Sequence, residues 1–177
     1  MDSVTKKTIE NCIADFPFTS FSFTALKTPT TIDAYKQWLK NNFHGSMSYL
    51  RDHLSFKEFP KTLFDQSLSA IVVTKDYFPA PQKSNLPIHN LRVAEYAKND
   101  DYHDWFKDQL DQLISKLEVE FPGEVFTAMT DSKPVLERDL AQKAGLGWFG
   151  KNTCLIDSKQ GSLFFICLLY TSDAADE

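Results

Sequence analysis

The segment that most constrains the fold is residues 69–74, which read Ser-Ala-Ile-Val-Val-Thr. This run of small and β-branched side chains is typical of a strand buried inside a sheet. Residues 21–26 alternate like a second strand, and residues 125–129 form a third candidate. We therefore expect a sheet whose strands are spread over much of the chain.

Helices are predicted between these strands. The clearest covers residues 101–121, where apolar side chains recur at helical spacing until Pro122 and Gly123 end the pattern. The remaining elements are helices over 4–15, after Thr31, over 47–53 and over 135–143, a proline-rich loop over 79–90, and a hairpin with arms 152–157 and 162–166. Because helices and strands are interleaved, the fold class is α/β or α+β.

The charge of the chain argues against a general nucleic-acid-binding surface. The formal net charge is −5, so an RNA substrate would need a local basic patch or another domain. Residues 1–16 lack the apolar core of a signal peptide, and no apolar run approaches the roughly 18 residues of a membrane span. We therefore expect a cytoplasmic protein without membrane association.

The cysteines and histidines form no metal-ligand pattern. The three cysteines are widely spaced, predict no disulfide framework and offer no recognisable motif for an iron–sulfur cluster. Three histidines also lack metal-ligand spacing, and we interpret them as surface or turn residues: His44, His53 and His89.

Residues 130–152 (TDSKPVLERDLAQKAGLGWFGKN) carry the strongest functional signal. A strand that ends at Met129 places Asp131 in a turn before a helix. Pro134 lies near the start of that helix, where the missing N–H of proline costs no hydrogen bond. Such a position is a usual place for a site in an α/β fold. The competing interpretation is an Asp131 that only caps the helix.

Three glycines follow that helix, at positions 145, 147 and 150. Glycine permits a positive φ and a close approach of the backbone to a ligand. The G-x-G-x-x-G spacing suggests a dinucleotide site, but that motif should follow a strand and open a helix, and here it follows a helix. We reject a dinucleotide site and keep two alternatives, a ligand-binding loop and a plain glycine-rich connection.

The same block resembles the signature of epoxyqueuosine reductases, D-S-x-P-[IVL]-L-E-R followed by A-G-L-G-W-x-G-K. Supporting similarities are HGSMSYL at 44–50, DYFP at 76–79, DYH at 101–103 and GSLFF at 161–165. The resemblance spans roughly residues 30–166. It implies an α+β fold, an α/β sandwich with a central mixed sheet flanked by helices, similar to the cobalamin-binding domain of reductive dehalogenases.

The resemblance also implies a two-part enzyme whose cobalamin-binding N-terminal domain is residues 1–166. Such an enzyme reduces the epoxide of epoxyqueuosine, at the anticodon wobble position of tRNA, to queuosine. Two [4Fe–4S] clusters would belong to a C-terminal domain that is missing here, so the fragment alone is expected to be inactive. An electron donor of the ferredoxin or flavodoxin type and a monomeric state are expected as well.

Site residues follow from the same resemblance. Asp131 matches the family's proposed proton donor, which is needed because opening an epoxide with two electrons leaves an oxyanion. The implied cofactor-binding residues are Tyr96, Tyr102, His103, Gly147, Trp148, Gly150, Lys151 and Asn152. Two alternatives stay open: Tyr102 and His103 can simply begin the 101–121 helix, and Lys151 can be a solvated loop lysine.

Residues 167–177 (CLLYTSDAADE) resemble the translation of a sequencing-library adapter. We expect the natural sequence to stop at Ile166, which would leave an exposed strand edge. A short natural polar tail is the alternative.

Two other functions compete with the reductase. A stand-alone corrinoid carrier or chaperone would need the glycine-rich loop and the aromatic residues but no iron–sulfur clusters. A flavin-binding reductase of related architecture is the third candidate, and a visible absorption spectrum would separate flavin from corrinoid.

Overall fold

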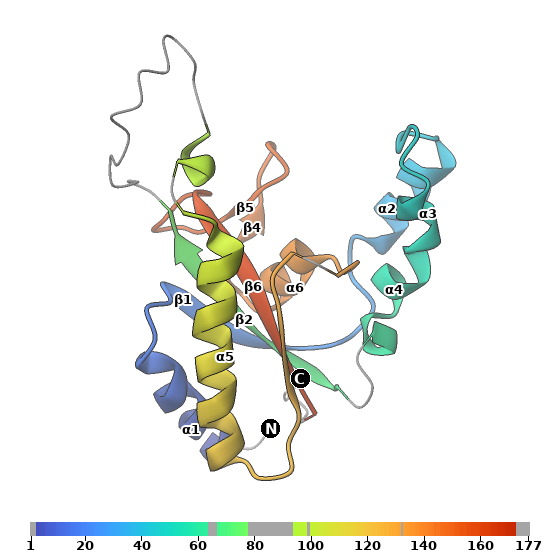
Figure 1. The fold of residues 1–177 in the computed structure, drawn as a ribbon. Helices are drawn as coiled ribbons and strands as arrows, with labels where there is room; N and C mark the ends of the chain where they lie inside the picture. The colour runs from blue at the N-terminus through green and yellow to red at the C-terminus, as the bar shows by residue number, and fades with distance from the viewer. Residues whose placement is uncertain (1–2, 64–66, 78–93, 99, 132, 173–177) are drawn as a thin grey trace.

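A four-stranded sheet forms the centre of the computed structural model, which describes residues 3–63, 67–77, 94–98, 100–131 and 133–172 (Figure 1). The strands are β1 (Ser20–Ala25), β2 (Ser69–Asp76), β3 (Phe126–Met129) and β6 (Phe164–Thr171), in the order β1-β2-β6-β3. The predicted α+β class is confirmed. The predicted mixed sheet is wrong, however, because all three neighbouring pairs are antiparallel. Strands β2 and β3 run in the same direction, but β6 lies between them and pairs with each in the opposite direction.

Two helices cover one face of this sheet, α1 (Ser3–Ala14) and α5 (Tyr102–Glu120). Their apolar sides pack onto Ile71 and Val73 of β2 and onto Leu169 of β6, all of which are fully buried. The apolar spacing predicted for residues 101–121 therefore does mark the buried side of α5.

Helix α6 (Glu137–Lys143) covers the opposite face. Its Leu140 and Ala141 belong to a second core cluster together with Ala70 and Val72 of β2. Alternate residues of β2 thus enter different cores, which explains why residues 69–74 are apolar or small on both sides. The result is a sandwich with helices on both faces of the sheet.

Three short helices and a 3-10 turn form a helical arm beside the sheet: α2 (Ile32–Lys40), α3 (Tyr49–Asp52), α4 (Leu54–Glu58) and η1 (Pro60–Leu63) (Figure 1). Thr31 precedes α2 as predicted, although its side chain makes no capping hydrogen bond.

The helical arm is attached to α6 through the buried carboxylate of Asp139. This carboxylate accepts hydrogen bonds from the backbone N–H and the hydroxyl of Thr30, at 3.1 and 2.7 Å, and from the backbone N–H of Thr31 at 3.0 Å. The Lys143 ammonium lies 3.7 Å from Asp139 and offsets its charge. A fully paired buried carboxylate fixes where the helical arm starts.

The predicted hairpin between residues 152–157 and 162–166 is wrong. Instead β5 (Leu155–Ile156) pairs with β4 (Trp148–Phe149), and β6 joins the central sheet. A tight turn does form at the predicted place, closed by an isolated bridge between Asp157 and Gly161, but the arms 152–157 and 162–166 do not pair. The reason is burial: β6 presents apolar side chains on both of its faces, and only a central position in the sheet covers both.

Strand β6 also extends beyond Ile166, where we expected it to end. Residues 167–170 are fully buried, because Cys-Leu-Leu-Tyr continues the apolar alternation into both cores. The expected exposed edge is wrong as well, since β6 has a neighbour on each side. The domain boundary at 166 and the adapter-like origin of 167–177 stay predictions, and the predicted loop over 79–90 lies outside the described residues.

We predict that Asp139→Ala lowers the free energy of unfolding by about 3 kcal/mol, since it removes three hydrogen bonds to a buried carboxylate and leaves the Lys143 ammonium without its partner. Urea denaturation measures the loss. The exposed Asp104→Ala on α5 serves as control and should stay within about 0.5 kcal/mol of wild type. Equal effects of the two substitutions would contradict the anchoring role.

Candidate active site

A cleft of about 1130 Å³ opens between the helical arm and the segment that leads into α6. The arm contributes mainly aromatic side chains, and the opposite wall contributes the charged residues of the 130–139 block. This volume lies slightly above the range of ordinary small-ligand pockets, about 300–1000 Å³. The cleft therefore has room for a large ligand.

The aromatic wall of the cleft is held in place by contacts within the arm. The rings of Tyr35 and Trp38 stack with centroids 5.7 Å apart, and the Tyr35 hydroxyl donates a hydrogen bond to the Leu50 carbonyl at 2.8 Å. The Lys57 ammonium lies 5.5 Å from the centre of the Tyr35 ring. A pair of stacked aromatic rings in the wall of a cleft suits a flat ligand.

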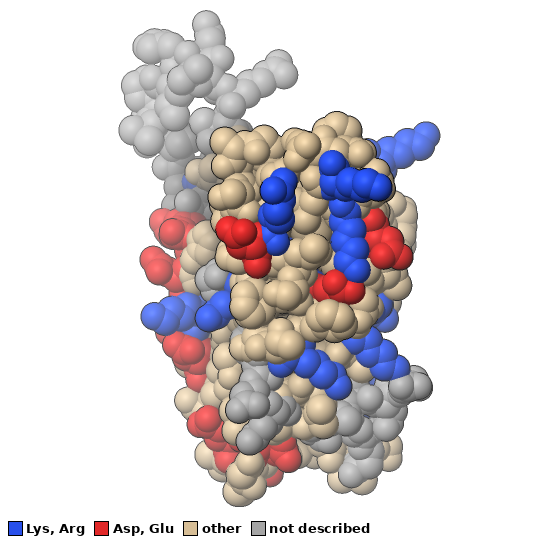
Figure 2. Space-filling model, turned by 90° about the vertical axis from the view of Figure 1, so that its right-hand side faces the viewer, with Lys and Arg blue, Asp and Glu red and all other residues tan. Residues whose placement is uncertain are grey.

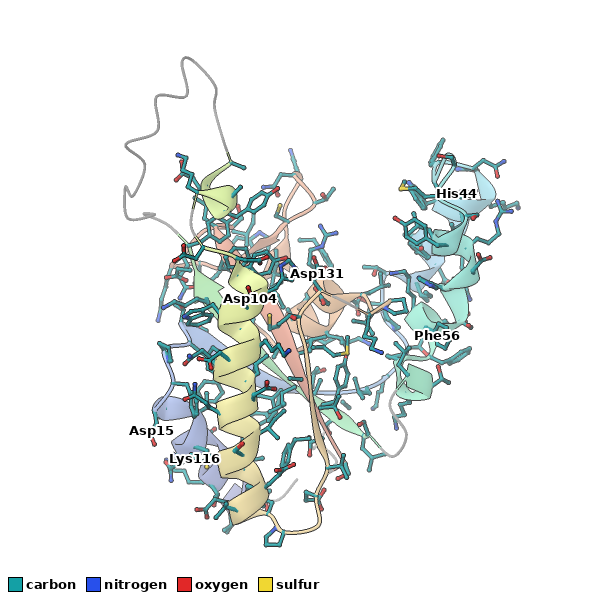
Figure 3. The ribbon with its side chains drawn as sticks, in the orientation of Figure 1. Asp15, His44, Phe56, Asp104, Lys116 and Asp131 are labelled. Atoms are coloured by element: carbon teal, nitrogen blue, oxygen red, sulfur yellow. The ribbon has the colours of Figure 1, made fainter. Side chains whose placement is uncertain are left out.

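Asp131 lies in the opposite wall, directly after β3. Its backbone is left-handed, with φ +48°, and its side chain is 65% exposed. Asp131 lies close to the end of α5 that carries Asp104 (Figure 3). The Tyr102 hydroxyl donates a hydrogen bond to Asp131 Oδ2 at 3.2 Å, and His103 Nε2 lies 4.0 Å from the same oxygen. Three of the predicted site residues, distant in sequence, thus meet beside the N-terminal end of α5.

Tyr102 and His103 begin helix α5, as one interpretation predicted, and they also lie beside Asp131, as a role in the site would require. They open α5, whose first turn is capped by Asp101: its Oδ1 accepts a hydrogen bond from the His103 backbone N–H at 2.9 Å. That hydrogen bond also lowers the pKa of Asp101. The Tyr102 ring stacks on Phe165 at 4.0 Å, and burial, followed by the charge of Asp131, raises the pKa of its hydroxyl. The two residues are therefore fixed by the helix and still face Asp131.

Glu137 is a residue of this wall that sequence reasoning missed. Its Oε1 is buried and has no hydrogen-bond partner among the described residues. Burial, and then the charge of Asp131, raises the pKa of Glu137 to about 7, although Lys57 and the backbone N–H of Asp131 act in the opposite direction. Glu137 stands in the E-R pair of the 130–139 block, but spacing alone could not reveal its burial.

The glycine-rich loop has a structural explanation of its own. A Cβ on Gly147 would lie 2.3 Å from the Ile156 carbonyl oxygen, and one on Gly150 would lie 2.5 Å from Ile156 Cδ1. Both glycines therefore allow β4 and β5 to pack closely. Gly150 also lines the cleft. Trp148 does not line it, and its side chain is 48% exposed.

The remaining predicted binding residues lie away from the cleft lining. Lys151 and Asn152 are exposed in the turn between β4 and β5, and the Asn152 side chain accepts a hydrogen bond from the Cys154 backbone N–H at 3.2 Å. Tyr96, in the short turn η2 (Glu95–Ala97), contacts the ring of Tyr77 edge-on at 6.5 Å. Their binding roles stay predictions.

Two of the three histidines lie in turns, which agrees with their interpretation as surface or turn residues, but both have further contacts. His44 is buried and its Nε2 lies 3.0 Å from Arg51 Nη2, while His53 lines the cleft. His89 falls outside the described residues. Within the described part of the chain, no group of three or more His, Cys, Asp or Glu side chains could hold a metal ion, and no helix is long and apolar enough to cross a membrane.

Comparisons with known proteins agree on one family. The family model described as epoxyqueuosine reductase QueG, DUF1730, matches residues 58–132. The epoxyqueuosine reductase of Francisella cf. novicida (strain Fx1) is 38% identical over 148 residues, which cover 80% of this chain and 41% of that protein. This chain therefore spans less than half the length of that relative.

Solved structures share the fold. The structure of epoxyqueuosine reductase from Streptococcus thermophilus has a TM-score of 0.75 at 18% identity, and the match covers 97% of this chain and 46% of that one. A crystal structure of epoxyqueuosine reductase with an epoxyqueuosine-modified tRNA-Tyr stem loop has a TM-score of 0.73 at 18% identity, covering 97% of this chain and 48% of that one.

We predict that Glu137 makes the stability of the fold fall as the pH rises. Its pKa of about 7 exceeds its ordinary 4.5, so between these values the folded chain holds this proton more tightly than the unfolded chain. The free energy of unfolding should therefore drop by up to about 3 kcal/mol from pH 4.5 to 7. Glu137→Gln should remove this contribution.

Urea denaturation at several pH values measures the difference between variant and wild type. The exposed Glu118→Gln on α5 is the matched control and should leave the pH profile unchanged. If the unfolding free energy of Glu137→Gln depends on pH in the same way as that of wild type, Glu137 makes no such contribution.

Proposed function

This chain is a relative of the epoxyqueuosine reductases, and we propose that it forms the cobalamin-binding part of such an enzyme. The complete enzyme would be an oxidoreductase that reduces the epoxide of epoxyqueuosine in tRNA to queuosine. The observation that carries this proposal is the position of Asp131: an exposed carboxyl group next to Tyr102, on the wall of a large aromatic cleft.

Asp131 is the proposed proton donor. Opening an epoxide with two electrons leaves an oxyanion, and a positioned carboxyl group can supply the proton that this oxygen needs. The left-handed turn after β3 directs Asp131 toward the cleft, and the hydrogen bond from Tyr102 holds its carboxyl group at one edge. His103 lies on the same helical turn as Tyr102, and its Nε2 is 4.0 Å from Asp131 Oδ2, within ion-pair range but beyond hydrogen-bonding distance.

The cleft fits a corrinoid in size and in chemistry. It combines the stacked wall of Tyr35 and Trp38, suited to a flat macrocycle, with Lys133 and Arg138, which can bind amide side chains and phosphate. We propose that these residues and Gly150 hold cobalamin. When bound, cobalamin supplies the low-potential electron transfer that the protein's own side chains cannot perform.

The two [4Fe–4S] clusters are proposed to reside in the part of the relatives' length that this chain does not match. Its three cysteines support that assignment, because Cys12 and Cys167 are buried and Cys154 is exposed, with no cluster-binding spacing among them. Electrons are proposed to arrive from a ferredoxin- or flavodoxin-type donor, and the enzyme is proposed to act as a cytoplasmic monomer.

The proposed partner is tRNA carrying epoxyqueuosine at the wobble position, and we propose that it approaches from the side of the helical arm. Figure 2 shows Lys and Arg side chains spread over the face that includes the arm, with fewer acidic side chains between them. Helix α5 has the opposite balance, since Asp104, Asp108, Asp111, Glu118 and Glu120 outnumber its lysines. Electrostatics favour the less acidic side for a polyanion.

We predict that Asp131→Asn leaves corrinoid binding intact and lowers the turnover of the full-length enzyme at least about 100-fold, the usual contribution of a general acid. Single-turnover conversion of epoxyqueuosine in tRNA measures the rate. The exposed Asp108→Asn on α5 is the control and should keep wild-type turnover. Wild-type turnover of Asp131→Asn would exclude the acid assignment.

We predict that this chain binds a corrinoid and that Trp38→Ala weakens the binding at least about tenfold, because the substitution removes one ring of the stacked wall. Titration followed by visible absorption gives the affinity and separates corrinoid from flavin. Phe59→Ala, an exposed aromatic residue of the arm outside the cleft lining, is the control. Saturable flavin binding without corrinoid binding would favour the flavin reductase instead.

A further inference from the structure

We propose that Phe165 is a positioning residue for Asp131 and acts through the ring of Tyr102. The inference rests on the proposed function and deepens it, because it names the group that holds the proposed proton donor in place. It begins from the GSLFF segment at 161–165, which carries part of the family resemblance but has no role in the proposed function.

The hydrogen bond from Tyr102 can position Asp131 only if Tyr102 itself is fixed. The distance of 3.2 Å between the Tyr102 hydroxyl and Asp131 Oδ2 is long for a bond between two oxygens, so a small displacement of the phenol would break it. The Asp131 side chain is 65% exposed, and water can replace the lost partner. The orientation of this carboxyl group therefore depends on what holds the Tyr102 ring.

Among the described residues, three rings contact Tyr102, and one of them comes from outside helix α5. His103 and Phe106 lie at centroid distances of 3.9 and 6.5 Å, but both belong to α5 and move with it. Phe165 of β6 stacks on Tyr102 with centroids 4.0 Å apart and an angle of 12° between the planes. This stack is the ring contact that fixes Tyr102 relative to the sheet.

Phe165 is itself held by the sheet. It lies in β6, which has strand neighbours on both sides, and pairs in register with Lys75 of β2. Its ring contacts Tyr77 at a centroid distance of 4.7 Å, and the Tyr77 backbone N–H donates a hydrogen bond to the Leu163 carbonyl at 3.2 Å. Phe165 and Tyr102 also pack against the core between the sheet and α5. A ring fixed on a central strand gives Tyr102 a stable support.

Strand β6 also places the backbone of Asp131. Residues 126–129 of β3 pair with residues 168–171 of β6, and Asp131 follows two residues after β3 ends. The same strand therefore positions the turn that carries Asp131 and the ring that supports its hydrogen-bond partner. This common support explains how Tyr102 and Asp131 stay in contact although they are 29 positions apart in the sequence.

The arrangement decides which carboxyl oxygen delivers the proton. Oδ2 of Asp131 accepts the hydrogen bond from Tyr102, so Oδ1 is the oxygen that carries the transferable proton. Burial, and then the charge of Asp131, raises the pKa of the Tyr102 hydroxyl, which therefore remains a donor at neutral pH. Without the Phe165 stack, Tyr102 would move and the carboxyl group would turn away, which slows the chemical step more than it weakens substrate binding.

Kinetics of the full-length enzyme test this role. Phe165→Leu should lower kcat about tenfold with little change in KM, whereas Phe165→Tyr keeps the ring and should stay within about twofold of wild type. Tyr102→Phe keeps the stack but removes the hydroxyl, and it should lower kcat about tenfold as well. Because both substitutions break the same line of contacts, the double variant should also lose about tenfold. A loss of about a hundredfold, the product of two independent effects, overturns the proposal.

Phe121→Leu is the matched control for general destabilisation. Phe121 is another part-buried ring of the same core, at the opposite end of α5 from Tyr102. The substitution should lower the urea midpoint to a similar extent as Phe165→Leu but keep wild-type kcat. Equal losses of kcat in Phe121→Leu and Phe165→Leu would show that Phe165 has only a structural role.

NMR of this chain separates the inference from the proposed function. The ¹³Cγ signal of Asp131 should shift in Phe165→Leu and in Tyr102→Phe and stay unchanged in Phe121→Leu. A signal that stays at its wild-type position in Phe165→Leu overturns the proposal. If the signal shifts as expected but the full-length wild type does not reduce epoxyqueuosine, the proposed function fails and the positioning of Asp131 by Phe165 stands.

Discussion

The interaction on which the rest of the structure depends is the one between the Asp139 carboxylate and the start of the helical arm. Three hydrogen bonds, from Thr30 and Thr31, join the arm to α6, and Lys143 offsets the buried charge. Because α6 is itself packed on the sheet, this contact sets the distance between the aromatic side chains of the arm and the charged residues that precede α6. The cleft is a consequence of that attachment.

Local sequence patterns located the elements well and their pairing poorly. The helix over 101–121 and the strand over 69–74 carry periodicities that reflect burial directly, and both are present with small changes of boundary. The partner of a strand depends on contacts with distant segments, so the position of β6 between β2 and β3 could not be read from residues 162–171. Adjacency in sequence alone favoured a hairpin between residues 152–157 and 162–166.

The candidate site divides in the same way. Asp131, Tyr102 and His103 were predicted through a family resemblance, and the fold brings them together although Tyr102 and Asp131 are 29 positions apart in the sequence. Glu137 and Lys57 were not predicted, because the shift of their pKa values depends on burial and on neighbouring charges that the sequence does not show. Gly147 and Gly150 were predicted to bind the cofactor, and the structure shows that the close packing of β4 and β5 already requires glycine at both positions.

The order of the strands has a consequence for how the molecule acquires its fold. Among the described strands β6 is the last in sequence, yet it occupies an interior position with neighbours on both sides. Until residues 164–171 have left the ribosome, β3 has no strand partner, and both cores lack the part of their shared wall that β6 provides beside β2. Folding must therefore wait for long-range pairing, which is slow, and the nascent chain exposes an unpaired edge of β2 in the meantime. The apolar side chains of β2 that face β6 in the folded chain are therefore exposed during synthesis for as long as β6 is missing.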